Sequence, residues 1–197
     1  HRLRKVKIKM SLTINPLQPF ILKGQADISA IYLESLTQLY QPIIGPESIG
    51  LYLTLMSLPT TVHVDSRRSL RHQILLLHLN IGIKELNDAR IKLEAVGLMR
   101  TYRDMESNSN PIHQTILYDL KLPLLNQAFF QDALLSTALL NQLGEKDYEE
   151  LTTLLTVEGI DEDRYAEETS TFQKALYPIQ VDESATKVID EDPEKVH

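Results

Sequence analysis

The chain has 197 residues, enough for one or two domains with a buried core. Hydrophobic residues make up 43% of it and charged residues 24%, as in ordinary globular proteins. The absence of cysteine excludes disulfides, zinc–thiolate sites and cysteine nucleophiles, and fits a reducing cytoplasm. The most apolar stretch, Ile74–Ile83, is shorter than the roughly 20 residues that a membrane-spanning helix needs.

The net charge of −7 is distributed unevenly along the chain. Residues 1–10 carry five Lys or Arg and no acid, and the middle of the chain is close to neutral. Residues 144–197 carry sixteen Asp or Glu against five Lys or Arg. Only this C-terminal part is acidic, so the overall charge does not exclude DNA binding by the rest.

The first ten residues begin with His1 rather than Met. We expect residues 1–10 to be a leader that is either non-native or disordered. If they are native, the alternation of three lysines with apolar residues predicts a strand with one basic face.

Residues 11–26 contain two prolines and one glycine around a short apolar run, which predicts an extended arm with a short strand. The run is Phe20, Ile21 and Leu22. A three-helix winged domain offers such a strand no evident partner, and exposed apolar strands tend to pair with another strand or subunit. We therefore predict that these three residues form an oligomer interface.

Residues 27–122 have the pattern of a winged helix-turn-helix. Two apolar helices meet in "LYQPIIGPESIGLYLTL" (Leu39–Leu55), where Pro42 is expected to end the first helix. Gly45 and Pro46 are expected to begin the second.

Two more amphipathic helices follow within residues 62–97, and Gly97 suits the position just after a helix end. Alternating segments at 98–105 and 114–120 then predict a hairpin around a polar loop. Helix, turn, helix and hairpin is the order of a winged helix-turn-helix.

Residues 123–178 return to helical spacing and predict a C-terminal helical extension. Its Phe129–Phe130 pair has two interpretations, packing in the core or a protein–protein surface. Residues 179–197 are polar and acidic, which predicts a linker. The predicted fold is therefore mostly α with a small β hairpin, an N-terminal arm and additional C-terminal helices.

Nothing in the sequence points to catalysis. It has no phosphate-binding glycine motif, no HExxH and no nucleophile elbow. Its internal histidines fall in different predicted elements and are interpreted as surface or half-buried residues: His63, His72, His78 and His113. We expect no enzyme, cofactor, metal site or small-molecule substrate.

The basic residues raise the question of DNA binding. The second helix of the predicted helix-turn-helix carries three cations and three acids, so it has no net charge to offer phosphate. Arginines before it and on the first wing strand could add weak, salt-dependent contacts, although a solvated face is the interpretation that we favour. The candidate nucleic-acid contacts are Arg67, Arg68, Arg71, Lys84, Arg90, Lys92, Arg100 and Arg103.

Three stretches resemble the N-terminal domain of the DnaB/DnaD-type replication initiation and membrane attachment (primosome) proteins of Gram-positive bacteria. They are "LTQLYQPIIGPESIGLYLTL" (Leu36–Leu55), "KLEAVGLMRTY" (Lys92–Tyr102) and "LPLLNQAFFQDALLSTALLNQLG" (Leu122–Gly144). This family is distinct from the replicative helicase that shares the name DnaB.

The resemblance implies a non-enzymatic scaffold that forms dimers or tetramers and helps recruit the helicase loader and the replicative helicase. It implies that DNA is bound weakly, or through a separate C-terminal domain. The expected location is cytoplasmic, and the family's membrane label would add a peripheral membrane association. The alternative is a winged-helix transcription regulator that reads specific duplex DNA through Arg90 and Lys92.

Overall fold

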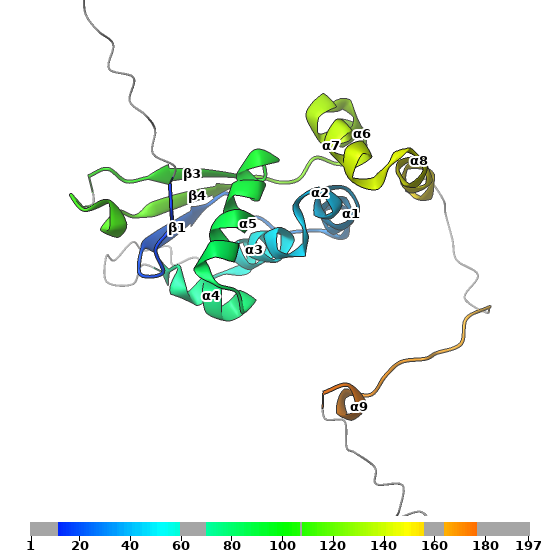
Figure 1. The fold of residues 1–197 in the computed structure, drawn as a ribbon, viewed down its shortest axis with the longest axis horizontal. Coiled ribbons are helices and arrows are strands. Elements are labelled where there is room, and N and C mark those ends of the chain that lie inside the picture. The colour runs from blue at the N-terminus through cyan, green and yellow to red at the C-terminus, as the bar shows by residue number, and fades with distance from the viewer. Residues whose placement is uncertain (1–11, 60–69, 107, 156–163, 177–197) are drawn as a thin grey trace, which may run out of the picture. The chain divides into compact units, whose positions relative to one another are not determined.

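The computed structural model describes residues 12–59, 70–106, 108–155 and 164–176 (Figure 1). The chain divides into two compact units, residues 1–156 and residues 157–197. In the second unit the structure describes one short helix, α9 (Phe172–Leu176). The predicted leader, the predicted acidic linker, Arg67 and Arg68 all lie outside the described residues.

The first long helix runs through the proline that was expected to end it. It consists of α1 (Ala30–Ser35), a π-helical turn, η1 (Leu36–Tyr40), and α2 (Gln41–Ile44). In the π turn the amide of Gln41 donates to the carbonyl of Leu36, five residues earlier. Pro42 then lies in the first turn of α2, where its missing N–H costs little. The prediction that Pro42 ends the helix was therefore wrong.

The sharp corner lies at Gly45, and it separates α2 from α3 (Pro46–Ser57) as expected. Gly45 has φ 84° and ψ 163°, a conformation that costs glycine little because it has no Cβ. Pro46 opens α3, and Glu47 in the first turn faces the positive end of the helix dipole.

The predicted helix-turn-helix is confirmed. Helix α4 (Gln73–Leu79) is followed by Asn80 in a left-handed conformation, and three residues, 80–82, connect it to α5 (Ile83–Ala95). Gly97 has φ 78°, as expected for the glycine after a helix end.

The predicted hairpin is also confirmed, but it belongs to a larger sheet. Strands β3 (Met99–Arg103) and β4 (Ile116–Leu120) pair antiparallel. Strand β1 (Pro19–Lys23) pairs parallel with β4 and antiparallel with β2 (Leu70–Arg71). The order is β2-β1-β4-β3, so the arm strand β1 is an internal strand of this sheet.

This pairing corrects the interpretation of the arm. Phe20 is 1% exposed and packs on the rings of His72 and Tyr118, at centroid distances of 4.9 and 5.8 Å. The expectation that the strand lacks a partner in its own domain was wrong, and Phe20 is not accessible to a second copy. Leu22 is half-buried and Ile21 is 37% exposed, so any role of these two in an oligomer interface stays a prediction.

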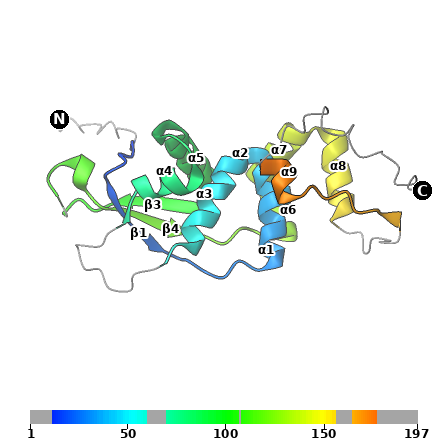
Figure 2. The same cartoon turned by 90° about the horizontal axis from the view of Figure 1, so that it is seen from below.

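One face of the sheet is packed against α4 and α5, and Figure 2 shows these helices on one side of the strands. The buried strand residues on that face are Phe20, Met99, Ile116, Tyr118 and Leu120. Among the described residues, Figure 2 shows no helix over the other face.

The C-terminal extension consists of α6 (Asn126–Gln131), α7 (Ala133–Leu143) and α8 (Glu145–Leu154). The carboxylate of Asp132 accepts the amides of Leu134 and Leu135, both at 3.0 Å. Asp132 thereby caps α7 and separates it from α6.

Phe129 anchors this extension to the first long helix. It is 0% exposed, and its ring meets that of Tyr40 edge-on at 5.1 Å. The hydroxyl of Tyr52 also donates to the carbonyl of Lys121 at 2.7 Å. Of the two interpretations of the phenylalanine pair, core packing is therefore correct for Phe129.

Candidate nucleic-acid and partner surfaces

The exposed face of α5 is where a winged helix normally meets DNA, and here it has no net charge. Lys84 and Lys92 are exposed on it together with Glu85 and Asp88. The ammonium of Lys84 lies 3.4 Å from the carboxylate of Asp88. Ile91 is 46% exposed between these charges. Such a face does not concentrate phosphate, because its lysines are matched by nearby acids.

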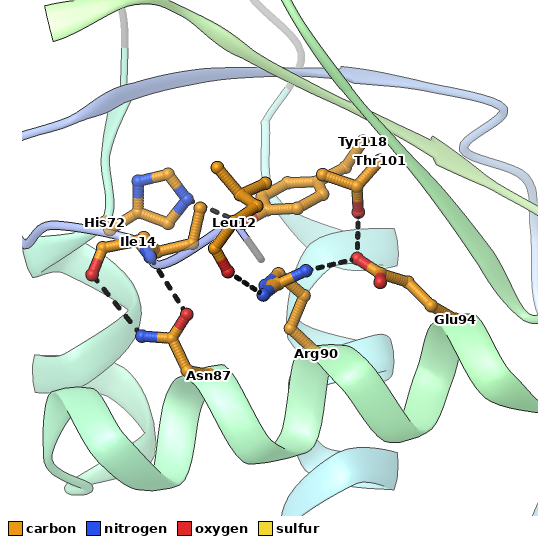
Figure 3. Close-up of polar contacts among 8 residues, drawn as sticks. All are labelled: Leu12, Ile14, His72, Asn87, Arg90, Glu94, Thr101 and Tyr118. Carbon is orange, nitrogen blue, oxygen red and sulfur yellow. Dashed lines mark hydrogen bonds and ion pairs between the residues drawn. The ribbon is translucent and has the colours of Figure 1, made fainter. Parts of the chain in front are cut away.

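The base-reading side chains of α5 point instead at the N-terminal arm (Figure 3). Asn87 forms two hydrogen bonds with the backbone of Ile14: its amide oxygen accepts at 2.9 Å and its amide nitrogen donates at 3.3 Å. The guanidinium of Arg90 donates to the carbonyl of Leu12 at 2.7 Å. Asn and Arg are the residue types that most often read adenine and guanine, and both are occupied inside the domain.

Arg90 also links α5 to the wing. Its guanidinium lies 2.6 Å from the carboxylate of Glu94, and the hydroxyl of Thr101 on β3 donates to the same carboxylate oxygen. Arg90 is 3% exposed. The prediction that it contacts nucleic acid was therefore wrong in this structure, because the arm and the wing strand enclose it.

A buried histidine completes the attachment of the arm. One ring nitrogen of His72, Nδ1, lies 2.7 Å from the carbonyl oxygen of Gln18, and Nε2 lies 2.7 Å from the hydroxyl of Tyr118. A carbonyl only accepts, so Nδ1 carries the proton and Nε2 accepts from Tyr118. Burial lowers the pKa of His72 to about 4, so the ring is neutral at pH 7. The expectation of a surface or half-buried histidine was wrong here.

The remaining arginine candidates do not form one surface. Arg71 is exposed on β2, ahead of α4 and not on it, and donates to the carbonyl of Leu17 at 3.4 Å. Arg100 is exposed and Arg103 half-buried on β3, at the opposite edge of the sheet. Their spacing of three places them on opposite faces of that strand. The contacts of all the exposed candidates with nucleic acid stay predictions.

A different basic cluster surrounds Asp119 in the middle of the sheet. Lys23 on β1 and Arg100 on β3 are both paired in register with Asp119 on β4. Lys121 lies 2.9 Å from the Asp119 carboxylate. The hydrogen bond from Lys121, with Lys23 and Arg100 nearby, lowers the pKa of Asp119. The sequence analysis did not identify this cluster, because Lys23 reaches Asp119 and Arg100 only through the parallel pairing of β1 with β4.

Within the described ranges, no three His, Asp or Glu side chains are grouped to hold a metal ion. In the same ranges no helix is long and apolar enough to cross a bilayer.

Helices α4 and α5 followed by the β3–β4 hairpin define a winged-helix domain, and an N-terminal strand inserted in its sheet distinguishes this one. The family described as the DnaB N-terminal winged helix domain matches residues 14–195. The chain belongs to this family.

Two known proteins are similar to the chain. It is 26% identical over 159 residues to the replicative helicase loading/DNA remodeling protein DnaB of Staphylococcus aureus, covering 81% of this chain and 33% of that protein. The chain therefore spans about a third of the length of this curated relative. The solved structure of primosome protein DnaB, residues 1–300, from Geobacillus stearothermophilus is 27% identical with a TM-score of 0.62. That match covers 81% of this chain and 58% of the other.

Proposed function

We propose that this chain is a non-enzymatic scaffold in the initiation of DNA replication, and that it helps recruit and load the replicative helicase. Membership of the DnaB N-terminal winged helix domain family supports this function. The names of the two relatives, one a helicase loading protein and one a primosome protein, support it further.

The observation that carries the proposal is the inward orientation of Asn87 and Arg90. A regulator that reads one operator presents such side chains to base edges, whereas here they hold the N-terminal arm. The transcription-regulator alternative loses Arg90, which is buried, and its other named residue, Lys92, shares its face with Glu85 and Asp88. A neutral surface with an exposed isoleucine suits a protein partner better than a DNA groove.

We infer that the outer face of α5, with Ile91 at its centre, contacts a protein of the helicase-loading machinery. The test measures binding of the chain to the purified replicative helicase and its loader, separately and together. Ile91→Asp should weaken binding to one of them at least tenfold, because it places a charge at the centre of the contact. The control is Thr152→Asp on the exposed surface of α8, which introduces the same charge elsewhere.

Two outcomes would reject this function. One is no binding of the unchanged chain to either protein; equal binding by Ile91→Asp, Thr152→Asp and the unchanged chain would instead reject only the contact through Ile91. The other is tight, sequence-specific binding to one duplex that survives moderate salt and is lost in Lys92→Ala. That second result would restore the transcription-regulator alternative.

Self-association into dimers or tetramers is a further part of the proposal. Light scattering at micromolar concentration should give the mass of two or four chains. Phe20 is buried in its own sheet, so a surface other than that side chain has to form the contact. A mass of one chain over this concentration range would remove self-association from the function.

A further inference from the structure

The sheet face opposite α4 and α5 carries an ordered set of side chains, which we call the outer sheet face. Residues paired across neighbouring strands point to the same side of a sheet, and so do residues two apart along a strand. The register of β1, β4 and β3 therefore defines the members of this face: Ile21, Lys23, Arg100, Tyr102, Leu117, Asp119 and Lys121.

The first row across this face is basic. Lys23, Asp119 and Arg100 are register partners on three adjacent strands, and Lys121 follows Asp119 by two positions on β4. Three cations therefore surround one carboxylate, which leaves two positive charges uncompensated within the cluster. Asp119 is 6% exposed and already bonded to Lys121, so it positions the cations and is not itself open to a ligand.

The backbone closes tightly around Asp119. Gly24 follows Lys23 with φ 78°, and a Cβ at that position would lie 2.3 Å from the carbonyl oxygen of Leu120. It would also lie 3.2 Å from a carboxylate oxygen of Asp119. Only glycine allows the chain to leave β1 at this point, and the arrangement holds Asp119 among its three cations.

The second row consists of one aromatic and two aliphatic residues. Tyr102, Leu117 and Ile21 are register partners on the same three strands. Tyr102 is 48% exposed and Ile21 37% exposed, so an aromatic and an aliphatic side chain are both open to a ligand. Adjacent rows are about 7 Å apart, since each strand residue advances roughly 3.3 Å. Beyond the second row, Asp104 follows the end of β3 and is acidic. The cations of this face are therefore Lys23, Arg100 and Lys121.

We propose that the outer sheet face binds single-stranded nucleic acid, with phosphates at Lys23, Arg100 and Lys121 and a base stacked on Tyr102. The observations match the two requirements of such a site, a row of cations for the backbone and an aromatic platform for unpaired bases. The whole chain has a net charge of −7, so attraction of nucleic-acid phosphates depends on the positive charge of this face alone. A duplex would offer its phosphates but no free base face to Tyr102.

This proposal is independent of the proposed function. It concerns the sheet, whereas the protein-partner contact concerns the outer face of α5. Loss of helicase or loader binding would leave it intact, and loss of nucleic-acid binding would leave the scaffold function intact.

The test measures the fluorescence anisotropy of a labelled 20-nucleotide oligo(dT) titrated with the 197-residue chain at 50 and 200 mM salt. Three phosphate contacts predict an affinity loss of about 20-fold between these salt concentrations. A variant with Lys23→Ala, Arg100→Ala and Lys121→Ala should bind at least tenfold more weakly at 50 mM salt and with a flatter salt dependence.

A charge-matched control separates the site from the total charge. Lys146→Ala, Arg164→Ala and Lys174→Ala remove the same number of positive charges from exposed positions on α8, ahead of α9 and on α9. This control should bind within about twofold of the unchanged chain. Equal weakening in the two triple variants would overturn the site, and so would binding that survives the first variant or no binding by the unchanged chain.

The aromatic contact is tested by a conservative pair. Tyr102→Phe should retain oligonucleotide affinity, whereas Tyr102→Ala should lose about tenfold, because only the second removes the stacking ring. Tyr102 is half exposed, so both variants should keep the thermal unfolding midpoint within a few degrees. Equal affinity of the two variants would overturn the stacking role.

Three competitors identify the class of ligand. Unlabelled oligo(dT) should displace the labelled strand, whereas a duplex of equal length and a glutamate-rich peptide should not. Displacement by the duplex would overturn the preference for single strands, and displacement by the peptide alone would assign the face to an acidic protein segment. A halved mass for Ile21→Asp in light scattering would assign it to a second copy of the chain.

Discussion

The outer face of α5 and the outer sheet face both carry cations, but they use them in opposite ways. On α5, Lys84 is paired with Asp88. The side chains of the residue types best suited to read bases, Asn87 and Arg90, are hydrogen-bonded to the N-terminal arm. On the sheet, one buried carboxylate positions three cations whose side chains remain exposed. The recognition helix of the winged-helix motif therefore holds the domain together here, whereas the proposed nucleic-acid site lies on a sheet surface that no sequence motif indicates.

The largest expected effect is a loss of stability at low pH, because protonation of His72 would break the attachment of the N-terminal arm to the rest of the domain. His72 has a pKa of about 4 in the fold and about 6.5 when unfolded. Between these values the unfolded chain binds a proton that the folded chain does not, so stability falls as the pH is lowered. The free energy of unfolding should decrease by about 3 kcal/mol from pH 6.5 to pH 4 in urea titrations.

A control identifies the source of that pH dependence. His78 on α4 is exposed, so His78→Gln should retain the full loss of stability between pH 6.5 and pH 4. The window lies above the titration of Asp119, whose pKa is lowered by Lys121. A chain whose stability is constant over the window would contradict the buried, neutral state of His72.

The second effect tests whether Arg90 is structural. Arg90→Ala should lower the free energy of unfolding at pH 7 by about 2 kcal/mol, because it leaves the Glu94 carboxylate and the Leu12 carbonyl without their charged donor. Lys92→Ala, two residues away and exposed, should change it by less than about 0.5 kcal/mol. An Arg90→Ala variant with unchanged stability would place Arg90 back among the candidate DNA contacts.

A smaller effect is expected at Asn87. Asn87→Ala removes two hydrogen bonds to the backbone of Ile14 at a partly buried site, which predicts a loss of about 1 kcal/mol. Hydrogen exchange should show faster exchange at the Ile14 amide, while the amides of β3 and β4 stay protected. Unchanged exchange at Ile14 would show that Asn87 is not what holds the arm.

The smallest effect concerns the ion pair on the outer face of α5. Lys84→Ala should change the free energy of unfolding by no more than about 0.5 kcal/mol, because the Lys84 and Asp88 side chains are 82% and 55% exposed. The measurement is urea unfolding at low and at high salt. A loss above 1 kcal/mol would show that this pair is more than a solvated surface contact.

Much of the fold was predictable because it depends on local periodicity and on glycine and proline. The helix-turn-helix, the hairpin, Gly45 at the corner and Gly97 after α5 all follow from patterns within a few residues. The π turn was missed because a proline can continue a helix when the preceding turn widens, and no residue pattern shows this in advance.

The candidate sites were harder to predict because they depend on contacts far apart in the chain. Nothing near Phe20 indicates that its strand pairs with Ile116, and nothing near Lys23 indicates Asp119 as its neighbour. The absence of net charge on the second helix was correctly identified, because a charge count needs no geometry. The burial of the Arg90 side chain was not predicted, because helical spacing shows only that Arg90 shares a face with Leu86 and Leu93.

The π turn between Leu36 and Tyr40 also explains how Leu124, in the segment between β4 and α6, is held. In a regular α-helix, positions five apart differ by about 140° around the axis and cannot approach the same target. The wider turn brings Ser35 and Tyr40 to one side, where the serine hydroxyl donates to the carbonyl of Leu124 and the tyrosine hydroxyl accepts its amide. The π turn thereby fixes both backbone groups of Leu124, in the segment that connects β4 to the C-terminal helices.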